Sequence, residues 1–277
     1  MGLFSTKYEI LVKFLFNYLI IKGGITVKKL IVFLILLIVF PFSVFAEDLT
    51  VAAAANVQFT VEDLKKSFEQ ETGLKVKTVI GSSGKLTTQI ENGAPFDVFL
   101  SADTGYPQAL YEEGLTYGQP RIYAYGTLVL WTLRSNVDLS AGIGVLADKS
   151  IKKVAIPNPQ NAPYGRKAVD VLKFYHLYQS TNKKLVYGES ISQVNQFIMS
   201  QAVDVGFTAK AIVLAQEMKN KGKWVEIDPQ SYERIAQGVV ITDYARKHNM
   251  AAAERFYEFL FSKKAREIFK KYGYILP

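Results

Sequence analysis

Four short segments of this 277-residue chain share a pattern that favours the binding of a small anion. Each follows a strand-like run, precedes a helix-like run and is rich in small or uncharged polar residues: 54–57, 81–84, 161–165 and 188–192. The first turn of a helix leaves backbone N–H groups without an intrahelical acceptor and carries a partial positive charge. One such segment alone indicates only a capped helix, because Ser and Asn are common caps. Four together could surround one anion with N–H donors.

The side chains that support most metal and covalent chemistry are scarce. The chain has no Cys, and His176 and His248 are its two histidines. Disulfides, cysteine–zinc sites, iron–sulfur clusters and thiol nucleophiles are therefore excluded, and a Ser-His-Asp triad has almost no components. The run 81–85 (Gly-Ser-Ser-Gly-Lys) is superficially similar to a phosphate-binding loop, but Leu86 stands where that loop requires Ser or Thr. We expect no enzyme, no nucleotide site and no directly coordinated metal cation.

The formal charge of +8 does not predict a nucleic-acid partner. Residues 1–46 hold five Lys and one Glu, so half of the basic excess lies there. In the remainder, basic pairs such as Lys65-Lys66 and Lys263-Lys264 are spread along the chain, which is typical of solvated helix faces. We therefore expect neither nucleic-acid nor membrane-surface binding.

The N-terminal region has the layout of an export signal. A pair of lysines precedes an apolar run over 30–40, Pro41 breaks that run, and small or modest residues follow up to Ala46. This layout predicts a signal peptide over 1–46, cleaved after Ala46, and a periplasmic product. An uncleaved membrane anchor is the alternative, since the 17 residues from Leu30 to Ala46 reach the lower length limit for a membrane span. Residues 1–26 precede the signal as an extension that we expect to be non-physiological.

Strands and amphipathic helices alternate from Leu49 onward, which indicates parallel strands flanked by helices. Strands are predicted over 49–55, 75–80, 96–100, 122–133, 153–156, 184–187, 203–207, 224–227 and 233–242. Helices are predicted around 61–68 and over 83–92, 107–113, 165–178, 191–201, 209–219, 254–261 and 263–271.

Two of the predicted strands, 122–133 and 233–242, are longer than the others, which indicates a chain that crosses to a second lobe and returns. The predicted fold is α/β, with two lobes of mixed, mainly parallel sheets joined by two crossover strands and a ligand cleft between the lobes. The predicted division is lobe I over 47–125 plus 239–277 and lobe II over 126–238. Hinge motion in the two crossovers would close the cleft.

Motifs in the same order along the chain resemble those of the periplasmic molybdate-binding proteins of ABC importers. Lobe I carries 52–56 (Ala-Ala-Ala-Ala-Asn), 81–86 (Gly-Ser-Ser-Gly-Lys-Leu), 89–99 and 101–103 (Ser-Ala-Asp). Lobe II and the C-terminal region add 163–165 (Pro-Tyr-Gly), 205–209 (Val-Gly-Phe-Thr-Ala), 265–269 and 272–274. The resemblance spans essentially all of 47–277. It implies a type II periplasmic-binding fold in which neutral donors hold a tetrahedral oxyanion.

The resemblance also implies, position by position, which residues bind the ligand: Ala55, Asn56, Ser83, Tyr164 and Ile191. Asn56 and Ser83 would add side-chain donors, whereas the other three would act through the backbone. Some members of the family place a Tyr hydroxyl on the ligand where this chain has Phe207. That contact is either absent here or replaced by Asn56 or Ser190.

Molybdate or tungstate fits these donors on physical grounds. A fully deprotonated dianion has only acceptors, so a selective site presents only donors, and a carboxylate would repel the ligand. Glu189 is therefore predicted to point away from the ligand, and Lys85 and Arg166 to steer anions. A receptor of the same fold for sulfate or for an organic solute stays open. The resemblance implies delivery to an inner-membrane ABC permease with a cytoplasmic ATPase; we expect a monomer without a cofactor.

Overall fold

The computed structural model describes residues 48–277, which lie in one compact unit. The predicted signal peptide 1–46 and its cleavage point after Ala46 lie outside the described residues. Within 48–277, no helix is long and apolar enough to cross a membrane.

The first sheet has five strands in the order β2-β1-β3-β10-β4. Their bounds are β1 Leu49–Ala54, β2 Val76–Gly81, β3 Val98–Leu100, β4 Thr116–Gly126 and β10 Ile235–Thr242. β1 pairs in parallel with β2 and β3, whereas β10 pairs antiparallel with β3 and β4. The parallel half brings the carboxyl ends of β1, β2 and β3 to one edge of the sheet.

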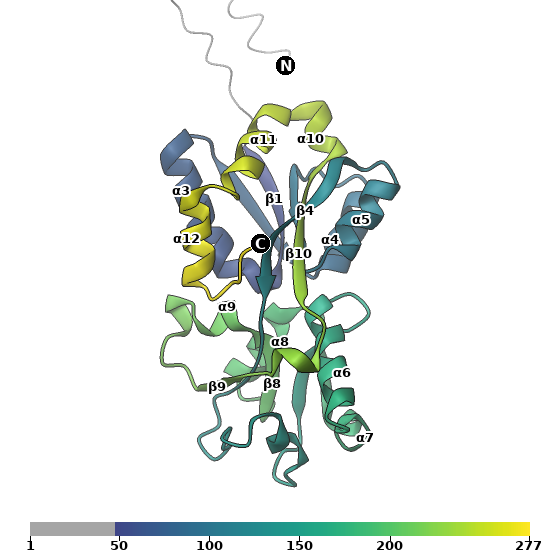
Figure 1. The fold of residues 1–277 in the computed structure, drawn as a ribbon, viewed down its shortest axis with the longest axis vertical. Helices are drawn as coiled ribbons and strands as arrows, with labels where there is room; N and C mark the ends of the chain where they lie inside the picture. The colour runs from purple at the N-terminus through teal and green to yellow at the C-terminus, as the bar shows by residue number, and fades with distance from the viewer. Residues whose placement is uncertain (1–47) are drawn as a thin grey trace, which may run out of the picture. The chain divides into compact units, whose positions relative to one another are not determined.

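Helices cover both faces of this sheet (Figure 1). Their bounds are α3 Gln58–Thr72, α4 Ser83–Glu91, α5 Gly105–Glu112, α10 Asp243–His248, α11 Met250–Phe259 and α12 Lys263–Lys271. Leu49, Val51 and Ala53 of β1 belong to the core with α3, α11 and α12, while Ala52 belongs to the core with α4 and α5. Because successive side chains of a strand point to opposite faces, β1 must be apolar on both. This explains why β1 is apolar at every position except Thr50.

The second sheet has the order β7-β6-β8-β5-β9. Its strands are β5 Leu128–Thr132, β6 Val154–Pro157, β7 Leu185–Gly188, β8 Val205–Ala209 and β9 Lys223–Glu226. The helices of this part are α6 Pro163–Phe174, α7 Tyr178–Thr181, α8 Ile191–Met199 and α9 Lys210–Val213. β6 pairs in parallel with β7 and β8, and β5 pairs antiparallel with β8 and β9. The predicted class, two α/β lobes with mixed sheets, is confirmed, and each sheet has two parallel and two antiparallel pairings.

The two sheets are linked by the long segments that the sequence singled out (Figure 1). The prediction of one strand over 122–133 is wrong in detail, because β4 ends at Gly126 in the first sheet and β5 begins at Leu128 in the second. On the return path, β10 pairs within the first sheet from Ile235 onward. The lobe boundaries stay a prediction; these pairings favour a return near 235 rather than 239.

Three further local predictions differ from the structure. The helix expected over 165–178 ends at Phe174, because His176 takes a left-handed φ of 56°. The N–H of Leu177 then donates to the carbonyl of Leu172 at 2.8 Å. This bond gives an acceptor group in the last turn of the helix a partner, as is usual where a left-handed residue ends a helix. The helix expected over 209–219 is α9 followed by a separate 3₁₀ turn. His248 ends α10 and stacks on Tyr244, instead of lying in a turn.

Candidate functional site

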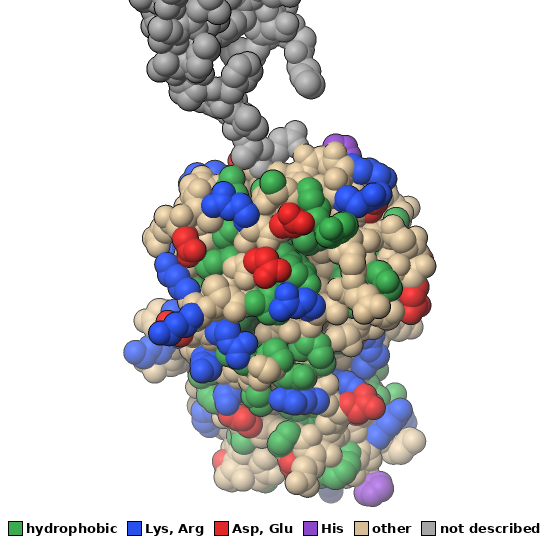
Figure 2. Space-filling view, turned by 45° about the horizontal axis from the view of Figure 1, so that its top comes forward, with side chains coloured by type: hydrophobic (Ala, Val, Ile, Leu, Met, Phe, Trp, Pro, Cys, Tyr) green, Lys and Arg blue, Asp and Glu red, His purple; other side chains and the backbone are tan. Residues whose placement is uncertain are grey.

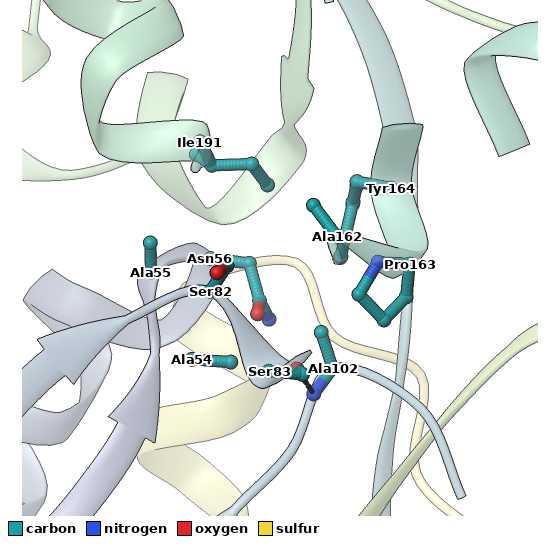
Figure 3. A pocket seen from close by; sticks show the side chains of 10 residues that line it. All are labelled: Ala54, Ala55, Asn56, Ser82, Ser83, Ala102, Ala162, Pro163, Tyr164 and Ile191. Carbon is teal, nitrogen blue, oxygen red and sulfur yellow. Dashed lines mark hydrogen bonds between the residues drawn. The ribbon is translucent and has the colours of Figure 1, made fainter. Parts of the chain in front are cut away.

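A pocket lies where strand ends and helix N-termini of the two sheets meet (Figure 3). Its lining residues are Ala54, Ala55, Asn56, Ser82, Ser83, Ala102, Ala162, Pro163, Tyr164 and Ile191. All five residues that the sequence assigned to the ligand are therefore in the lining, and none is more than 4% exposed. The empty volume is about 200 Å³, against 600 to 750 Å³ for four other hollows of the described chain. A site this small suits a ligand of a few atoms better than an organic solute.

The first corner follows β1 and holds Asn56, which is 1% exposed. Its Nδ2 donates to Gln237 Oε1 at 2.9 Å and to Tyr274 Oη at 3.3 Å, and Tyr274 Oη donates back to the Asn56 carbonyl at 3.1 Å. Asn56 Oδ1 is buried and has no partner among residues 48–277. The amide is thus held from behind by two side chains far away in the sequence.

The second corner follows β2 and opens α4. Ser83 Oγ accepts the backbone N–H of Ala102 at 2.9 Å, a bond drawn in Figure 3. Because that bond uses a lone pair, the hydroxyl proton of Ser83 remains available as a donor. The N-cap, Ser82, makes no capping bond, and its buried Oγ lacks a partner in the described chain. The sequence analysis missed Ser82 as a lining residue, although its place at the N-cap was a usable signal.

The third and fourth corners open α6 and α8 in the second sheet's half of the molecule. Pro163 is the first residue of α6 and its N-cap makes no side-chain bond, so the next N–H, that of Tyr164, has no intrahelical acceptor. Ile191 is the first residue of α8 and has the same free N–H position. The Tyr164 side chain turns back to accept from Gln237 Nε2 at 3.1 Å, so its contribution to the pocket is its backbone.

Asn56 and Ser190 were the two residues expected to replace a Tyr hydroxyl at Phe207, and their positions relative to the pocket distinguish them. Phe207 is fully buried in the apolar core of the second sheet and does not line the pocket. Ser190 caps α8, its Oγ accepting the N–H of Gln193 at 3.5 Å, and it is outside the lining too. Asn56 is the candidate that the structure places at the pocket.

Charged side chains surround the pocket without lining it. Lys85 Nζ lies 2.7 Å from a Glu189 carboxylate oxygen, and Arg166 pairs with Asp103. Glu189 is outside the lining. Both cations expected to steer anions are thus paired with a carboxylate carried by the other sheet's half of the molecule. Their net field toward an arriving anion is smaller than the sequence suggested.

Neutral contacts join the same two halves. Gly84 N donates to Asn161 O at 2.9 Å, and Ser192 Oγ bonds Gln58 Oε1 at 2.5 Å. A Cβ on Gly84 would lie 3.0 Å from Asn161 Cα and 2.7 Å from Tyr106 Oη, so glycine permits this close approach of the two corners. The structure is that of a closed cleft.

Comparison with known proteins gives the family. Residues 49–275 match the family described as bacterial extracellular solute-binding protein. The chain belongs to that family. Within it, the chain is 38% identical over 230 residues to the molybdate-binding protein ModA of Azotobacter vinelandii, covering 83% of this chain and 90% of that one. It is 36% identical to the protein of the same name from Rhodobacter capsulatus, covering 83% and 89%.

A solved structure supports the same family assignment for this solute-binding protein. The periplasmic molybdate-binding protein of Azotobacter vinelandii superposes with a TM-score of 0.77 at 37% identity, covering 83% of this chain and all of that one. The resemblance stated from the motifs is thereby confirmed. Over the described residues, no cluster of three His, Cys, Asp or Glu side chains is arranged to hold a metal ion.

Proposed function

We propose that this solute-binding protein is an extracytoplasmic receptor for molybdate, and also for tungstate, that delivers the oxyanion to an ABC permease. The observation that carries the proposal is the pocket itself: it is enclosed by corners at helix N-termini from both sheets, and its lining holds no charged side chain. The relatives named for molybdate binding support the choice of ligand.

The lining favours an anion that carries no proton. Helix N-termini and O–H or N–H donors stabilise negative charge, and hydrogen bonds to a charged ligand strengthen where water is excluded. A carboxylate in the lining could accept the proton of a hydrogen phosphate, but none is present there. Dianions with four acceptor oxygens therefore match the pocket, and phosphate matches it less well.

Ala55, Asn56, Ser83, Tyr164 and Ile191 are the proposed ligand-binding residues. Tungstate has nearly the same size and charge as molybdate, so the same donors should hold both. Sulfate has the same charge and a smaller radius, and a receptor for sulfate is the second candidate.

The cellular setting is part of the proposal. Export through the predicted signal peptide would place the chain in the periplasm, where it would meet an inner-membrane permease with its cytoplasmic ATPase. We propose that it acts as a monomer, without a cofactor and without catalytic activity. Opening and closing would occur in the segments that link the two sheets, around Gly126 and Ile235.

Titration calorimetry of the purified protein against molybdate, tungstate, sulfate and phosphate tests the ligand. We expect tight binding of molybdate and tungstate, weaker binding of sulfate and none of phosphate. Tight binding of sulfate or phosphate together with no heat from molybdate would overturn the assignment. Heat from none of the four would overturn the oxyanion receptor as such.

A further inference from the structure

Gln237 of β10 is a fully buried polar residue that joins the candidate site to both halves of the molecule. Its Oε1 accepts from Asn56 Nδ2 at 2.9 Å and from Tyr123 Oη at 2.7 Å, and its Nε2 donates to Tyr164 Oη at 3.1 Å. Tyr123 Oη also lies 3.1 Å from the carbonyl oxygen of Ser101. One side chain thus contacts a first-corner amide, a crossover strand and the start of α6.

With the two side-chain amides oriented in this way, which we call the first sense, the hydrogen-bond donors and acceptors of the network do not match in number. Asn56 Oδ1 has no partner in the described part of the chain. Burial raises the pKa of Tyr164 and of Tyr123 well above the ordinary value, so both hydroxyls keep their protons. The Tyr164 proton then has no acceptor, since Gln237 presents an N–H group to it. Tyr123 has one proton for two acceptors, Ser101 O and Gln237 Oε1.

Turning both amides by 180° keeps the heavy-atom contacts and reverses their sense, because amide N and O have the same shape. Gln237 Nε2 then donates to Asn56 Oδ1 and to Tyr123 Oη, and Tyr123 gives its proton to Ser101 O. Gln237 Oε1 then accepts the proton of Tyr164. The reversal gives up the long 3.3 Å bond from Asn56 to Tyr274, whose hydroxyl still donates to the Asn56 carbonyl.

The reversed network leaves one group of these side chains without a partner, and that group is the Asn56 NH₂. This NH₂ group takes the position that the buried, unpartnered Oδ1 of Asn56 has in the first sense, and Asn56 is one of the residues that line the pocket (Figure 3). In the first sense the same position holds a carbonyl oxygen, which repels an oxyanion. The sense of the network therefore decides whether the first corner attracts or rejects the ligand.

We propose that Gln237 is a positioning residue that sets the amide of Asn56 as a donor to a bound oxyanion, with Tyr164 fixing the sense of Gln237. This deepens the proposed function and rests on it.

A double-mutant cycle tests the proposal. Gln237→Met keeps the length of the side chain and removes its amide. We expect it to weaken binding of whichever oxyanion the wild type binds by at least tenfold. In an Asn56→Ala background, the same change should alter the affinity less than twofold, because Gln237 acts through Asn56. Equal weakening in both backgrounds would overturn the proposal and leave Gln237 a packing residue.

Tyr123→Phe is the matched control, since it removes a partner of Gln237 but not the Gln237–Asn56 contact. We expect less than a threefold loss of affinity from it. A loss as large as that of Gln237→Met would contradict the special role of Gln237.

Side-chain amide NMR on the wild type gives a readout that needs no variant. With molybdate bound, the Gln237 NH₂ protons should show NOEs to the Tyr123 ring rather than to the Tyr164 ring. Contacts to Tyr164 alone would overturn the proposed sense. If none of the oxyanions binds the wild type, the proposed function fails, while the sense of the network is still read from these NOEs in the free protein.

Discussion

Ser83 and Asn56 are the two side chains that separate this pocket from an ordinary meeting of helix ends. Each is 1% exposed, and each is held from behind, Ser83 by the N–H of Ala102 and Asn56 by Gln237. Such second contacts determine which way a donor points and lower the cost of ordering it when a ligand binds. In the proposed receptor, the pocket would recognise the charge of its ligand through the orientation of neutral donors.

Ser83→Ala should weaken molybdate binding by about 1–3 kcal/mol, because it removes a buried donor to a charged ligand. It also leaves the Ala102 N–H without its acceptor, so the melting temperature should fall. Calorimetry and thermal unfolding measure the two effects. Ser180→Ala, at an exposed hydroxyl that bonds Leu177 O, is the matched control and should change neither. An unchanged affinity of Ser83→Ala would reject the contact.

Among the elements, the C-terminal helix α12 contacts α3 through an ion pair, and aromatic side chains pack in the core next to this contact. Asp63 of α3 lies 2.8 Å from Lys271 Nζ and 3.0 Å from Tyr272 Oη, and Phe68 meets Phe256 edge-on in the core below. This contact supports Tyr274, which follows α12 and donates its hydroxyl proton to the backbone carbonyl of Asn56.

Stability should depend on pH through Asp63. Burial raises its pKa, but hydrogen bonds from Lys271 and Tyr272 and the Lys271 charge outweigh burial, so its pKa lies below the ordinary value. A carboxyl with a lowered pKa in the folded state stabilises the fold above the unfolded pKa, and this stabilisation is lost as pH falls through the folded pKa. Asp63→Asn should therefore cost about 1 kcal/mol at pH 7 and progressively less as pH falls below 4.

Denaturant unfolding at pH 7 and pH 3 measures this difference between wild type and Asp63→Asn. Tyr272→Phe removes one of the two hydrogen bonds and should give a smaller loss at pH 7. A difference between wild type and Asp63→Asn that stays the same at both pH values would contradict the assignment.

Gly126, the last residue of β4, is a second element-level feature. A Cβ there would overlap Tyr164 Oη and Gln237 Nε2 in the closed structure. Gly126→Ala should therefore disfavour closure by about 1–3 kcal/mol and weaken oxyanion binding accordingly. Small-angle scattering with saturating molybdate should show a less compact protein. Gly144→Ala is the control, because its Cβ meets only Ala141 Cβ at 3.8 Å; equal effects of both changes would refute the steric argument.

At the scale of the whole molecule, charge is distributed rather than gathered into one field. Figure 2 shows basic and acidic side chains interspersed over the face drawn there. At the rim of the pocket, Lys85–Glu189 and Arg166–Asp103 each join residues on the two sides of the cleft. Because these side chains are partly exposed, each pair contributes at most about 1 kcal/mol, so the pairs bias closure without locking it.

A charge swap tests this role of the rim. Lys85→Glu places two carboxylates together and should weaken oxyanion binding by up to about fivefold, less at high salt. Adding Glu189→Lys restores an opposite pair with the original net charge and should restore most of the affinity. Calorimetry at two salt concentrations distinguishes the outcomes: failure of the double swap to recover affinity would mean that Lys85 acts on the ligand and not on closure.

Local patterns predicted much of the fold and of the site. The apolar runs of β1 and β6 and the small residues that open α4, α6 and α8 act within a few residues of chain, so their spacing was informative. The predicted helix was too long at His176, because the left-handed residue that ends a helix is usually glycine and His176 gave no such signal. The break at Thr127 had only a weak local signal, because Gly126 and Thr127 interrupt the mostly apolar segment 122–133 without a Pro or a polar loop; the pairing of β4 and β5 in different sheets is what divides it.

The sequence by itself determined that four helix-opening corners exist, that they lack Cys and His chemistry, and which of their residues are candidates for a small oxyanion. These properties follow from strand periodicity, helix ends and residue type, all of which are local. Only the tertiary structure decided that the corners enclose one pocket, that Lys85 and Arg166 are paired across it, and that Gln237 and Tyr274 hold Asn56. Those partners lie 181 and 218 residues from Asn56, and the contact depends on two sheets closing together, which no short stretch of sequence records.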